Sequence, residues 1–493
     1  MSHIAALPAH NLADQIALHA RQRPTQPALI HGEKTLDYRQ LNLAVRQRAA
    51  RLADLGVTPG GIVGIALEDS IEHVLMLYAV ARAGAVILPM DCRWRDNEKQ
   101  RLAAHFEPAA VMVEPGAAFD GAPCISVDEA WRDAVAATDA ERDFPDGARG
   151  IAMSLSSGTT GRPKGPMVSH QKFLNRFWTH WVDLGFGSRE TYINATPLYF
   201  GGGRAFSMST LYAGGTVVLC PPPYKPEALA AEVARTGSTV LFLVPTLLRR
   251  LRACDTATLA PLMQLKTLVS SGSALTAAER VQIRETICPN FIEYYSSTEG
   301  GGISVLSPRD QKLFGESVGR PVFGVEVQIV DEADVPVPPG TIGRIRYRGP
   351  AVADGFHRDP EASREAFREG FFYPGDLGCF NDQGYLFLKG RAKDMIIRGG
   401  VNIYPLEVES MLMSHPAVTD AAVVGWPSRE FDEEVAAFVT VRSPVEPQAL
   451  IALCRSQLAP YKAPRQVFVV EELPRNSLGK VVKATLVQRL SPL

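Results

Sequence analysis

Ser156-Ser157-Gly158-Thr159-Thr160-Gly161-Arg162-Pro163-Lys164-Gly165 carries the clearest chemical signal in this sequence. These residues include three glycines, four hydroxyl side chains and a lysine, and they follow the apolar run Ile151–Leu155. Glycine lets backbone N–H groups turn toward an anion, hydroxyls add hydrogen-bond donors, and lysine adds a positive charge. The stretch therefore predicts a loop that holds phosphate groups.

Two other interpretations of this loop fit less well. The loop of nucleoside triphosphatases has glycine, four residues and then Gly-Lys-Ser/Thr, whereas Pro163 stands five places after Gly158 here. A flexible linker rich in glycine and serine would not be expected to follow a buried strand and to end in Pro-Lys-Gly. We expect a phosphate-binding loop of another kind.

The bulk composition is that of a globular protein with more than one domain. The chain has 493 residues, of which 46% are hydrophobic and 21% charged, with a net charge of −2. This charge provides no general attraction for nucleic acid or an anionic membrane. Seven scattered cysteines without CxxC spacing predict neither a zinc site nor a disulfide framework, so we expect a cytoplasmic protein.

We expect neither a signal peptide nor a membrane anchor. Met1–His10 has no basic segment followed by a long apolar one. The most apolar run, Val74–Met90, is interrupted by Arg82 and Gly84 and is too short to span a bilayer. We interpret it as a helix followed by the buried strand Ala85–Leu88.

Helical and strand patterns alternate through the first two-thirds of the chain, which predicts an α/β fold of parallel sheets flanked by helices. The clearest expected elements are the helix Tyr38–Leu55, the strand Ile62–Leu67, the helix Pro226–Arg235 and the strand Val240–Val244. The stretch Ala134–Gly150 is expected to be a surface connector. From about Gly319 a β-rich subdomain is expected, with short strands at Val325–Val330, Gly343–Arg348 and Gly384–Leu388.

The last hundred or so residues predict a separate α+β unit. Its expected elements are the helices Leu406–Met413 and Ala449–Leu458 and the strands Val418–Gly425, Val435–Val441 and Gln466–Val470. We therefore expect a large N-terminal domain over residues 1–392 and a small, mobile C-terminal domain over residues 393–493.

Five further segments give the phosphate loop a specific context. In chain order they are Tyr294–Gly300, Gly375–Leu377, Lys389–Asp394, Gly399-Gly400 with Pro405–Glu407, and Pro474–Lys480. Together with Ser156–Gly165, in this order, they closely resemble the adenylate-forming superfamily. That superfamily comprises acyl- and aryl-CoA synthetases, luciferases and peptide-synthetase adenylation domains. The resemblance covers essentially the whole chain and is strongest to an acyl-CoA ligase.

The resemblance implies a two-step reaction with ATP, Mg²⁺ and CoA. A carboxylate first attacks the α-phosphate of ATP and releases pyrophosphate, and the CoA thiol then attacks the acyl-adenylate and releases AMP. Lys480 is implied to bridge the carboxylate and the α-phosphate, with Thr298 on the α-phosphate and Glu299 as the Mg²⁺ ligand. The alternatives are a solvated loop lysine and a carboxylate at the start of a helix.

The resemblance also implies a nucleotide site, a hinge and a CoA tunnel. Asp376 would accept the ribose hydroxyls, Arg391 would add a ribose or phosphate contact, and Lys393 would be the hinge. Gly399 and Gly400 would line the tunnel for the pantetheine arm. The remaining expected ATP- and AMP-binding residues are Ser156, Ser157, Gly158, Thr159, Thr160, Gly161, Lys164, Gly272, Ser273, Ala274, Tyr295 and Ser296.

Several positions depart from the family pattern or leave alternatives open. Ser296 stands where the family usually has glycine, and Gly272–Ala274 could equally be a plain turn. Phe431 is a candidate contact for the CoA nucleotide, although Asp432 follows it instead of the usual glycine.

The acid pocket is expected around Tyr199 and Phe200. Phe200 stands where many CoA ligases have histidine, which makes the pocket more apolar and favours an apolar acid. No acidic residue occurs in Pro197–Gly201 to hold an amino group, so an amino-acid substrate is not expected. Arg204 would hold a second carboxylate if it faced the pocket, but we expect a surface or helix-end arginine.

We expect an ATP-dependent carboxylic acid–CoA ligase whose partners are a small-molecule acid, ATP and CoA. The subunit state, including a homodimer, stays open. The first alternative is a stand-alone adenylating enzyme that loads an acyl- or aryl-carrier protein. A luciferase-like oxygenase and a non-catalytic nucleotide sensor are further alternatives.

Overall fold

Two largely parallel sheets form the N-terminal part of the molecule in the computed structural model, which describes residues 11–140, 150–153, 155–157, 163–475 and 481–491. One sheet has the strand order β10-β7-β4-β3-β5-β6. Its strands are β3 (Ile62–Ala66), β4 (Val86–Pro89), β5 (Ala110–Val113), β6 (Cys124–Ser126), β7 (Gly150–Met153) and β10 (Met167–Ser169).

The second sheet has nine strands in the order β17-β16-β15-β14-β13-β11-β12-β1-β2. They are β1 (Pro27–His31), β2 (Lys34–Asp37), β11 (Thr191–Asn194), β12 (Thr216–Leu219), β13 (Val240–Leu243), β14 (Thr267–Ser270), β15 (Phe291–Ser297), β16 (Gly301–Leu306) and β17 (Arg320–Pro321). Strands from β1 through β12, β11, β13 and β14 to β15 are parallel. Every residue of β3, β13 and β14 is buried, as expected for strands that helices cover on both faces.

Helices flank these sheets and one hydrophobic core joins them. The core contains Val63 and Ile87 of the first sheet together with Tyr192 and Val217 of the second. The helices are α1 (Leu12–Gln22), α2 (Tyr38–Asp54), α3 (Ile71–Arg82), α4 (Asp96–Phe106), α5 (Glu129–Ala136), α6 (His170–Val182), α7 (Gly201–Ala213), α8 (Pro226–Thr236), α9 (Pro245–Arg252), α10 (Thr256–Leu259), α11 (Ala277–Thr286) and α12 (Pro308–Leu313).

The predicted β-rich subdomain is a third, antiparallel sheet. It contains β18 (Glu326–Val330), β19 (Gly343–Arg348), β20 (Phe367–Arg368), β21 (Phe371–Phe372), β22 (Asp376–Phe380) and β23 (Leu386–Arg391), with helix α13 at Pro360–Ala366. The expected strand Gly384–Leu388 was placed too early. Gly384 lies in a turn with φ +77°, where its N–H donates to Asn381 O at 3.0 Å, and the strand starts two residues later.

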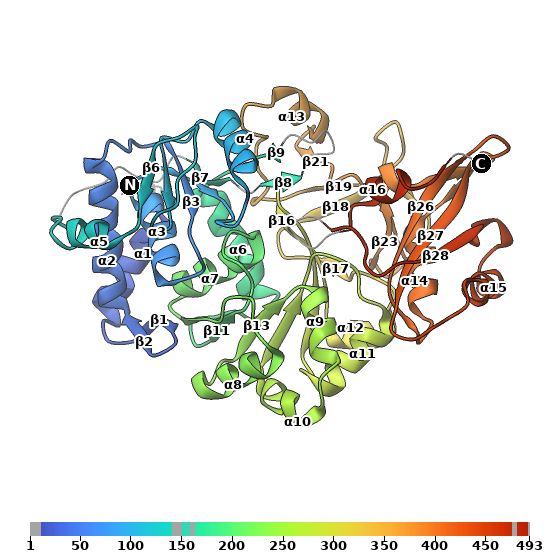
Figure 1. The fold of residues 1–493 in the computed structure, drawn as a ribbon, viewed down its shortest axis with the longest axis horizontal. Coiled ribbons are helices and arrows are strands. Elements are labelled where there is room, and N and C mark those ends of the chain that lie inside the picture. Colours follow the sequence, from blue (N-terminus) through green and yellow to red (C-terminus); the bar gives the residue numbers. More distant parts are fainter. Residues whose placement is uncertain (1–10, 141–149, 154, 158–162, 476–480, 492–493) are drawn as a thin grey trace, which may run out of the picture.

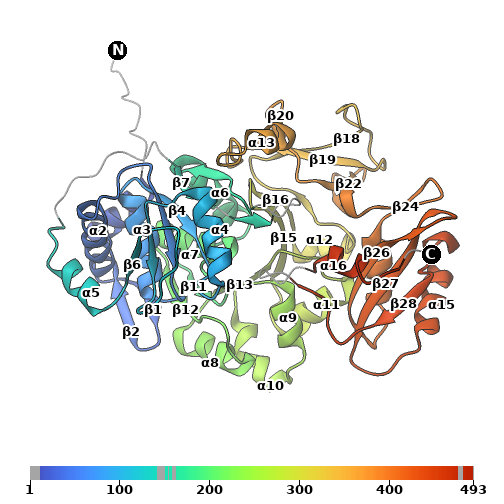
Figure 2. The same cartoon turned by 45° about the horizontal axis from the view of Figure 1, so that its top comes forward.

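The C-terminal unit has its own sheet and its own hydrophobic core, which includes Val408, Val435 and Leu450. Its elements are β24 (Ile396–Arg398), β25 (Val401–Ile403), α14 (Pro405–Met413), β26 (Val418–Ser428), β27 (Asp432–Val441), α15 (Pro447–Gln457), β28 (Gln466–Val469) and α16 (Lys483–Val487). Figures 1 and 2 show this sheet at the end of the molecule opposite α1 and α2. The predicted fold class is confirmed.

Most predicted elements are present within a few residues of their expected bounds. Helix α2 begins at Tyr38 because Asp37 caps it: the Gln40 N–H donates to the Asp37 carboxylate at 2.8 Å, and the Gln40 side chain accepts from the Asp37 N–H at 2.9 Å. The apolar run Val74–Met90 contains most of α3 and then β4, so the predicted order of a helix followed by a buried strand is present. Among the described residues, none of the helices combines the length and the apolar character that a membrane span needs. The expected connector Ala134–Gly150 starts inside α5, and residues 141–149 lie outside the described part.

Candidate active site

A cavity of about 1370 Å³ lies where the N-terminal sheets, the β-rich sheet and helix α14 meet. The structure brings most of the predicted site residues to its wall. These are Lys164, Tyr199, Phe200, Gly272, Ser273, Ala274, Tyr295, Ser296, Thr298, Glu299, Asp376 and Arg391. Gly158, Thr159, Thr160, Gly161 and Lys480 lie outside the described residues.

The two arms of the phosphate loop pair with each other. Strand β8 (Ser156–Ser157) is antiparallel to β9 (Pro163–Lys164), with Ser156 opposite Lys164. The Lys164 ammonium lies 5.1 Å from the centre of the Phe356 ring, and the His357 N–H donates to Gly165 O at 2.8 Å. Pairing and this ring contact hold Lys164 at the cavity.

Gly165 allows the loop to leave the cavity close to α4. A Cβ at this position would lie 2.6 Å from the Phe106 ring, too close for any side chain. Gly165 is therefore needed for packing against Phe106, independently of the expected role of the loop in binding phosphate.

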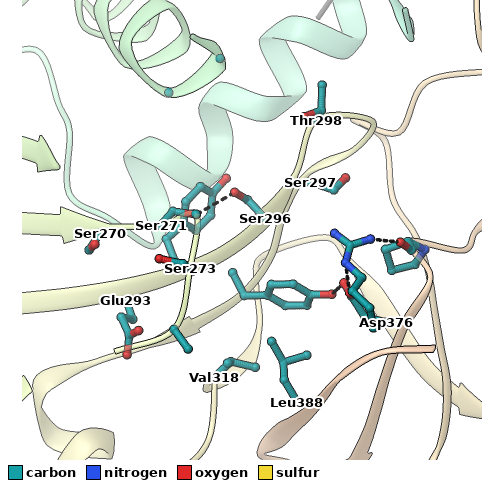
Figure 3. Close-up of a pocket in the computed structure, with 18 of the residues that line it drawn as sticks. Ser270, Ser271, Ser273, Glu293, Ser296, Ser297, Thr298, Val318, Asp376 and Leu388 are labelled. Atoms are coloured by element: carbon teal, nitrogen blue, oxygen red, sulfur yellow. Dashed lines mark hydrogen bonds and ion pairs between the residues drawn. The ribbon is translucent and has the colours of Figure 1, made fainter. Parts of the chain in front are cut away.

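Asp376 is a buried carboxylate with two oriented partners. The Tyr295 hydroxyl donates a hydrogen bond to one of its oxygens, and Arg391 Nε lies 2.8 Å from the other (Figure 3). Asp376 and Arg391 face each other across the pair β22–β23. Burial and the Asp376 charge raise the pKa of Tyr295, so its hydroxyl stays protonated and donates. This carboxylate can accept hydroxyl hydrogen bonds from a ribose at the cavity wall.

The turn that follows β15 presents Thr298 and Glu299 to the cavity. Gly300 N–H donates to Ser297 Oγ at 3.0 Å, and a Cβ on Gly300 would lie 2.3 Å from the Tyr347 hydroxyl. Glycine thus allows the turn to pack against the β-rich sheet. The Ala353 N–H donates to Glu299 O at 2.9 Å. The backbone of the turn is fixed from outside, while its side chains line the cavity.

The donor set at this turn suits Mg²⁺ bound to a nucleotide. Mg²⁺ prefers oxygen ligands and takes one or two carboxylates together with substrate phosphates and water. Glu299 supplies one carboxylate and Thr298 one hydroxyl at the cavity wall. The described residues contain no cluster of three or more His, Cys, Asp and Glu that would hold a metal without a nucleotide.

Small residues line the cavity wall that follows β14. Gly272 has φ +115°, a backbone conformation that other residues rarely adopt. Ser271 and Ser296 share a hydrogen bond of 3.0 Å between their hydroxyls (Figure 3). Ser296, in place of the family's usual glycine, thus connects the end of β15 to this wall.

Aromatic rings form the deep wall of the cavity beside Phe200. Phe206, on α7, stacks on Phe242 with ring centres 4.9 Å apart and on His180 with ring centres 4.2 Å apart. A Cβ on Gly202 would lie 2.5 Å from Phe242, so this glycine lets α7 approach the rings. A flat apolar group fits against such a wall.

Arg204 lies in the first turn of α7, as the helix-end alternative predicted, but the prediction of a surface residue is wrong. Its side chain is 1% exposed and lines the cavity. Nη1 donates to Leu198 O at 3.3 Å and Tyr199 O at 3.0 Å, so the guanidinium holds the segment that precedes α7. Burial and the positive charge of Arg176 lower the pKa of Arg204 to about 10, which leaves it charged at neutral pH.

Helix α6 contributes two polar cavity residues that sequence analysis missed, Arg176 and His180. Both are buried, and they stand one helical turn apart. Burial and the charge of Arg176 lower the pKa of His180 to about 3, so this imidazole is neutral. A polar pair at i and i+4 in a helix rich in aromatic residues is the signal that would have found them.

The predicted hinge and tunnel residues do not line the cavity. Lys393 lies in the short 3₁₀ helix Ala392–Asp394 between β23 and β24. Gly399 and Gly400 form the turn between β24 and β25, with φ of +55° and +80°. Phe431 packs there: its carbonyl accepts from the Gly399 N–H at 2.8 Å, and its ring lies 4.1 Å from the Arg398 guanidinium carbon.

Helix α14 and its flanks close the cavity in place of these glycines. The lining residues from this part are Tyr404, Leu406, Glu407, Ser410, Met411, Met413 and Ser414. The tunnel assignment stays a prediction.

Comparisons with known proteins agree with this site. Residues 16–357 match the model of the AMP-binding enzyme family, and residues 407–480 match that of the AMP-binding enzyme C-terminal domain. The chain is 32% identical to a feruloyl-CoA synthase from Amycolatopsis sp., over 95% of this chain and 97% of that protein. It is 31% identical to an indoleacetate–CoA ligase from Aromatoleum aromaticum, over 96% of each chain.

A solved structure shares the whole fold. The ATP-bound MatB of Rhodopseudomonas palustris superposes with a TM-score of 0.90 at 29% identity, over 98% of this chain and 99% of that one. The chain belongs to the AMP-binding enzyme family and is an adenylate-forming enzyme of the acyl-CoA ligase type, which uses ATP, Mg²⁺ and CoA to turn a carboxylic acid into its CoA thioester through an acyl-adenylate.

Proposed function

We propose that this acid–CoA ligase activates an aromatic carboxylic acid. The observation that carries the proposal is the stack of Phe242, Phe206 and His180 along the deep wall of the cavity. Aromatic rings prefer offset or edge-on contacts with other rings, which adds to the burial of their apolar area. The names of the two relatives, a feruloyl-CoA synthase and an indoleacetate–CoA ligase, support the same class of acid.

The nucleotide is proposed to lie between the small-residue wall and Asp376. Gly272, Ser273 and Ala274 would flank the adenine, because small residues permit close approach of the backbone. Asp376, oriented by Tyr295 and Arg391, would accept the ribose hydroxyls. Lys164 and the loop before it would hold the β- and γ-phosphates, which leave as pyrophosphate.

Two negatively charged groups, the acid and the triphosphate, must meet for the first step. Bound Mg²⁺ would offset the phosphate charge, with Glu299 as its protein ligand. Thr298 would donate to the α-phosphate. Arg176 and Arg204 add two buried positive charges to the same cavity wall, which favours the approach of anions.

Lys480 is proposed to act at the reacting centre. Its ammonium would neutralise the carboxylate and the α-phosphate while one carboxylate oxygen bonds to phosphorus and pyrophosphate departs. A flexible, compact cation suits a site where charge moves during the reaction. The variant Lys480→Ala should lose acyl-adenylate formation and retain thioester formation from supplied adenylate. Lys483→Ala, which removes a lysine paired with Glu409 at 2.7 Å, is the matched control.

The second step is proposed to need a rotation of residues 393–493 against residues 1–392. Lys393 would be the hinge, and Gly399 and Gly400 would reach the cavity to leave room for the pantetheine arm. The CoA thiol would then attack the acyl carbonyl, with loss of its proton and departure of AMP. The position of α14 at the cavity, with both glycines away from it, supports assigning the described arrangement to the first step.

The acid class is tested by measuring CoA thioester formation with aromatic, aliphatic and dicarboxylic acids. We expect kcat/KM to be highest for aromatic acids. A clear preference for an unbranched aliphatic acid would contradict the proposed class. Replacing CoA by phosphopantetheinylated carrier proteins tests the acceptor, and faster transfer to a carrier would favour the carrier-loading alternative.

A further inference from the structure

Arg176 is a buried cation that, among the described residues, hydrogen-bonds only to main-chain oxygens. Nη1 donates to Thr298 O at 3.2 Å, Nη2 to Glu299 O at 2.9 Å and Nε to Ala351 O at 3.4 Å. The residue is 7% exposed. Three donors of one rigid fork thus hold the turn after β15 and the segment around Ala351 together.

Further contacts between α6, residues 350–353 and the turn after β15 also fix the turn. The Ala353 N–H donates to Glu299 O at 2.9 Å, and Asn175 Nδ2 donates to Pro350 O at 2.8 Å. Gly301, with φ +76°, lies so close that a Cβ there would be 3.1 Å from Arg176 Cγ. Helix α6, the turn and residues 350–353 therefore form one packed unit with Arg176 at its centre.

Burying the Arg176 charge does not stabilise the folded state, so its position needs another explanation. Burial lowers the pKa of Arg176, the nearby Glu299 charge offsets this only in part, and within the described part of the chain the guanidinium forms no ion pair with a carboxylate. A buried charge without an ionic partner is unfavourable, and an apolar side chain of similar size would avoid this penalty. Unlike an apolar side chain, the guanidinium fixes the backbone geometry of the turn after β15.

We propose that Arg176 is a positioning residue for adenylate formation. By holding the carbonyls of Thr298 and Glu299, it fixes the direction in which their side chains enter the cavity. This inference rests on the proposed roles of those two side chains with phosphate and Mg²⁺. It concerns chiefly the first half-reaction, because the thiol step needs neither pyrophosphate release nor the metal held by Glu299, whereas the α-phosphate that Thr298 contacts is present in both steps.

The test compares Arg176→Met and Arg176→Lys with Lys172→Ala. Lys172 lies one turn earlier on α6 and pairs at the surface with Asp354, which is 87% exposed, so its loss is a matched control. A displacement of about 1 Å at a reacting group can lower the rate about 100-fold. We expect a loss of this order in kcat for acid-dependent pyrophosphate exchange in both Arg176 variants. Lysine should not restore activity, because it lacks the planar fork.

Three readouts separate positioning from a general structural role. Thioester formation from supplied acyl-adenylate should fall by a much smaller factor than pyrophosphate exchange, because only the contact of Thr298 with the α-phosphate is common to both steps. The increase in ATP affinity that Mg²⁺ brings, measured by calorimetry with and without Mg²⁺, should be lost. If Arg176→Met melts far below wild type, Arg176→Lys, which keeps the charge and most of the volume, provides the comparison.

Equal loss of both half-reactions, or full exchange activity in either Arg176 variant, would overturn the inference. Failure of the proposed function is a different result. In that case the wild type itself would show no acid-dependent pyrophosphate exchange.

Discussion

The hydroxyl of Tyr295 donates a hydrogen bond to Asp376, and the two residues come from different sheets. Tyr295 is on β15 of the nine-stranded sheet, and Asp376 begins β22 of the β-rich sheet. Arg391 holds the second oxygen of the same carboxylate at 2.8 Å. The proposed ribose contact is therefore built at the junction of the two sheets, so its geometry depends on how they pack.

Loss of the Asp376 carboxylate should weaken ATP binding. Hydrogen bonds to a charged group contribute about 1.5–3 kcal/mol, so Asp376→Ala should raise the KM for ATP more than tenfold. Tyr295→Phe keeps the carboxylate but removes one partner, so its effect should be smaller. Steady-state kinetics with varied ATP measures both, with the exposed Asp382→Ala as control. An unchanged KM for ATP in Asp376→Ala would contradict the ribose assignment.

The contact between Lys164 and Phe356 should contribute to binding of the leaving group. A cation over a ring contributes about 0.5–1 kcal/mol at an exposed site, which corresponds to about a two- to fivefold change. Phe356→Leu should raise the KM for ATP by this factor, and Lys164→Ala should raise it more. The KM for pyrophosphate in the exchange reaction should follow the same order.

Phe323→Leu is the control for this comparison, since Phe323 is 55% exposed. A Phe356→Leu enzyme with altered KM for the acid and normal KM for ATP would show that the ring serves the acid pocket.

Substitution of Arg204 should affect the acid more than the nucleotide. Its guanidinium holds the carbonyls of Leu198 and Tyr199 beside the acid pocket. Arg204→Met should therefore raise the KM for the acid by a larger factor than the KM for ATP. Kinetics with a monocarboxylic and a dicarboxylic aromatic acid distinguish two roles of Arg204, which are holding the backbone beside the pocket and binding a second carboxylate of the acid. If the wild type prefers the dicarboxylic acid and Arg204→Met loses this preference, Arg204 binds a second carboxylate.

Buried histidines should make the protein less stable in mild acid. Burial lowers the pKa of His73 and His170 to about 4 and, with the Arg176 charge, that of His180 to about 3, against 6.5 in the unfolded chain. Below pH 6.5 these histidines bind protons in the unfolded state but not in the folded state. Their contribution to the free energy of unfolding is therefore fully present above pH 6.5 and is lost as the pH falls toward 4. Each histidine contributes about 1.4 kcal/mol per pH unit in this window.

The variant His180→Phe tests this linkage. The drop in melting temperature between pH 7 and pH 5 should be smaller than in wild type, because one of the three groups is gone. His31→Phe, at the partly exposed end of β1, should leave the drop unchanged. An equal drop in His180→Phe and wild type would contradict a neutral buried His180.

Local chemistry in the sequence predicted the nucleotide side of the cavity well. Residues such as Lys164, Glu299 and Asp376 lie in short motifs whose backbone geometry is fixed. The order of these motifs along the chain therefore predicts that the three residues lie at one site. All three line one cavity. The alternation of helix and strand likewise predicted parallel sheets, because buried strands such as β3 are apolar throughout.

The acid side could not be predicted in the same way. Arg204 was expected at the surface because arginine is rarely buried, yet α7 begins with Gly201–Gly203, which lets the helix approach the rings and carries Arg204 inside. Arg176 bonds to carbonyls 122 and 123 residues further along the chain. Contacts of this kind depend on tertiary packing and leave no local pattern.

The central claim is that this protein forms an acyl-adenylate from ATP and an aromatic acid before the thiol takes part. The most direct measurement is the exchange of labelled pyrophosphate into ATP with purified protein, Mg²⁺ and an aromatic acid, in the absence of CoA. The account predicts exchange that depends on the acid and is lost in Lys480→Ala. Exchange that requires CoA, or no exchange with any acid of a broad aromatic and aliphatic panel, would contradict it.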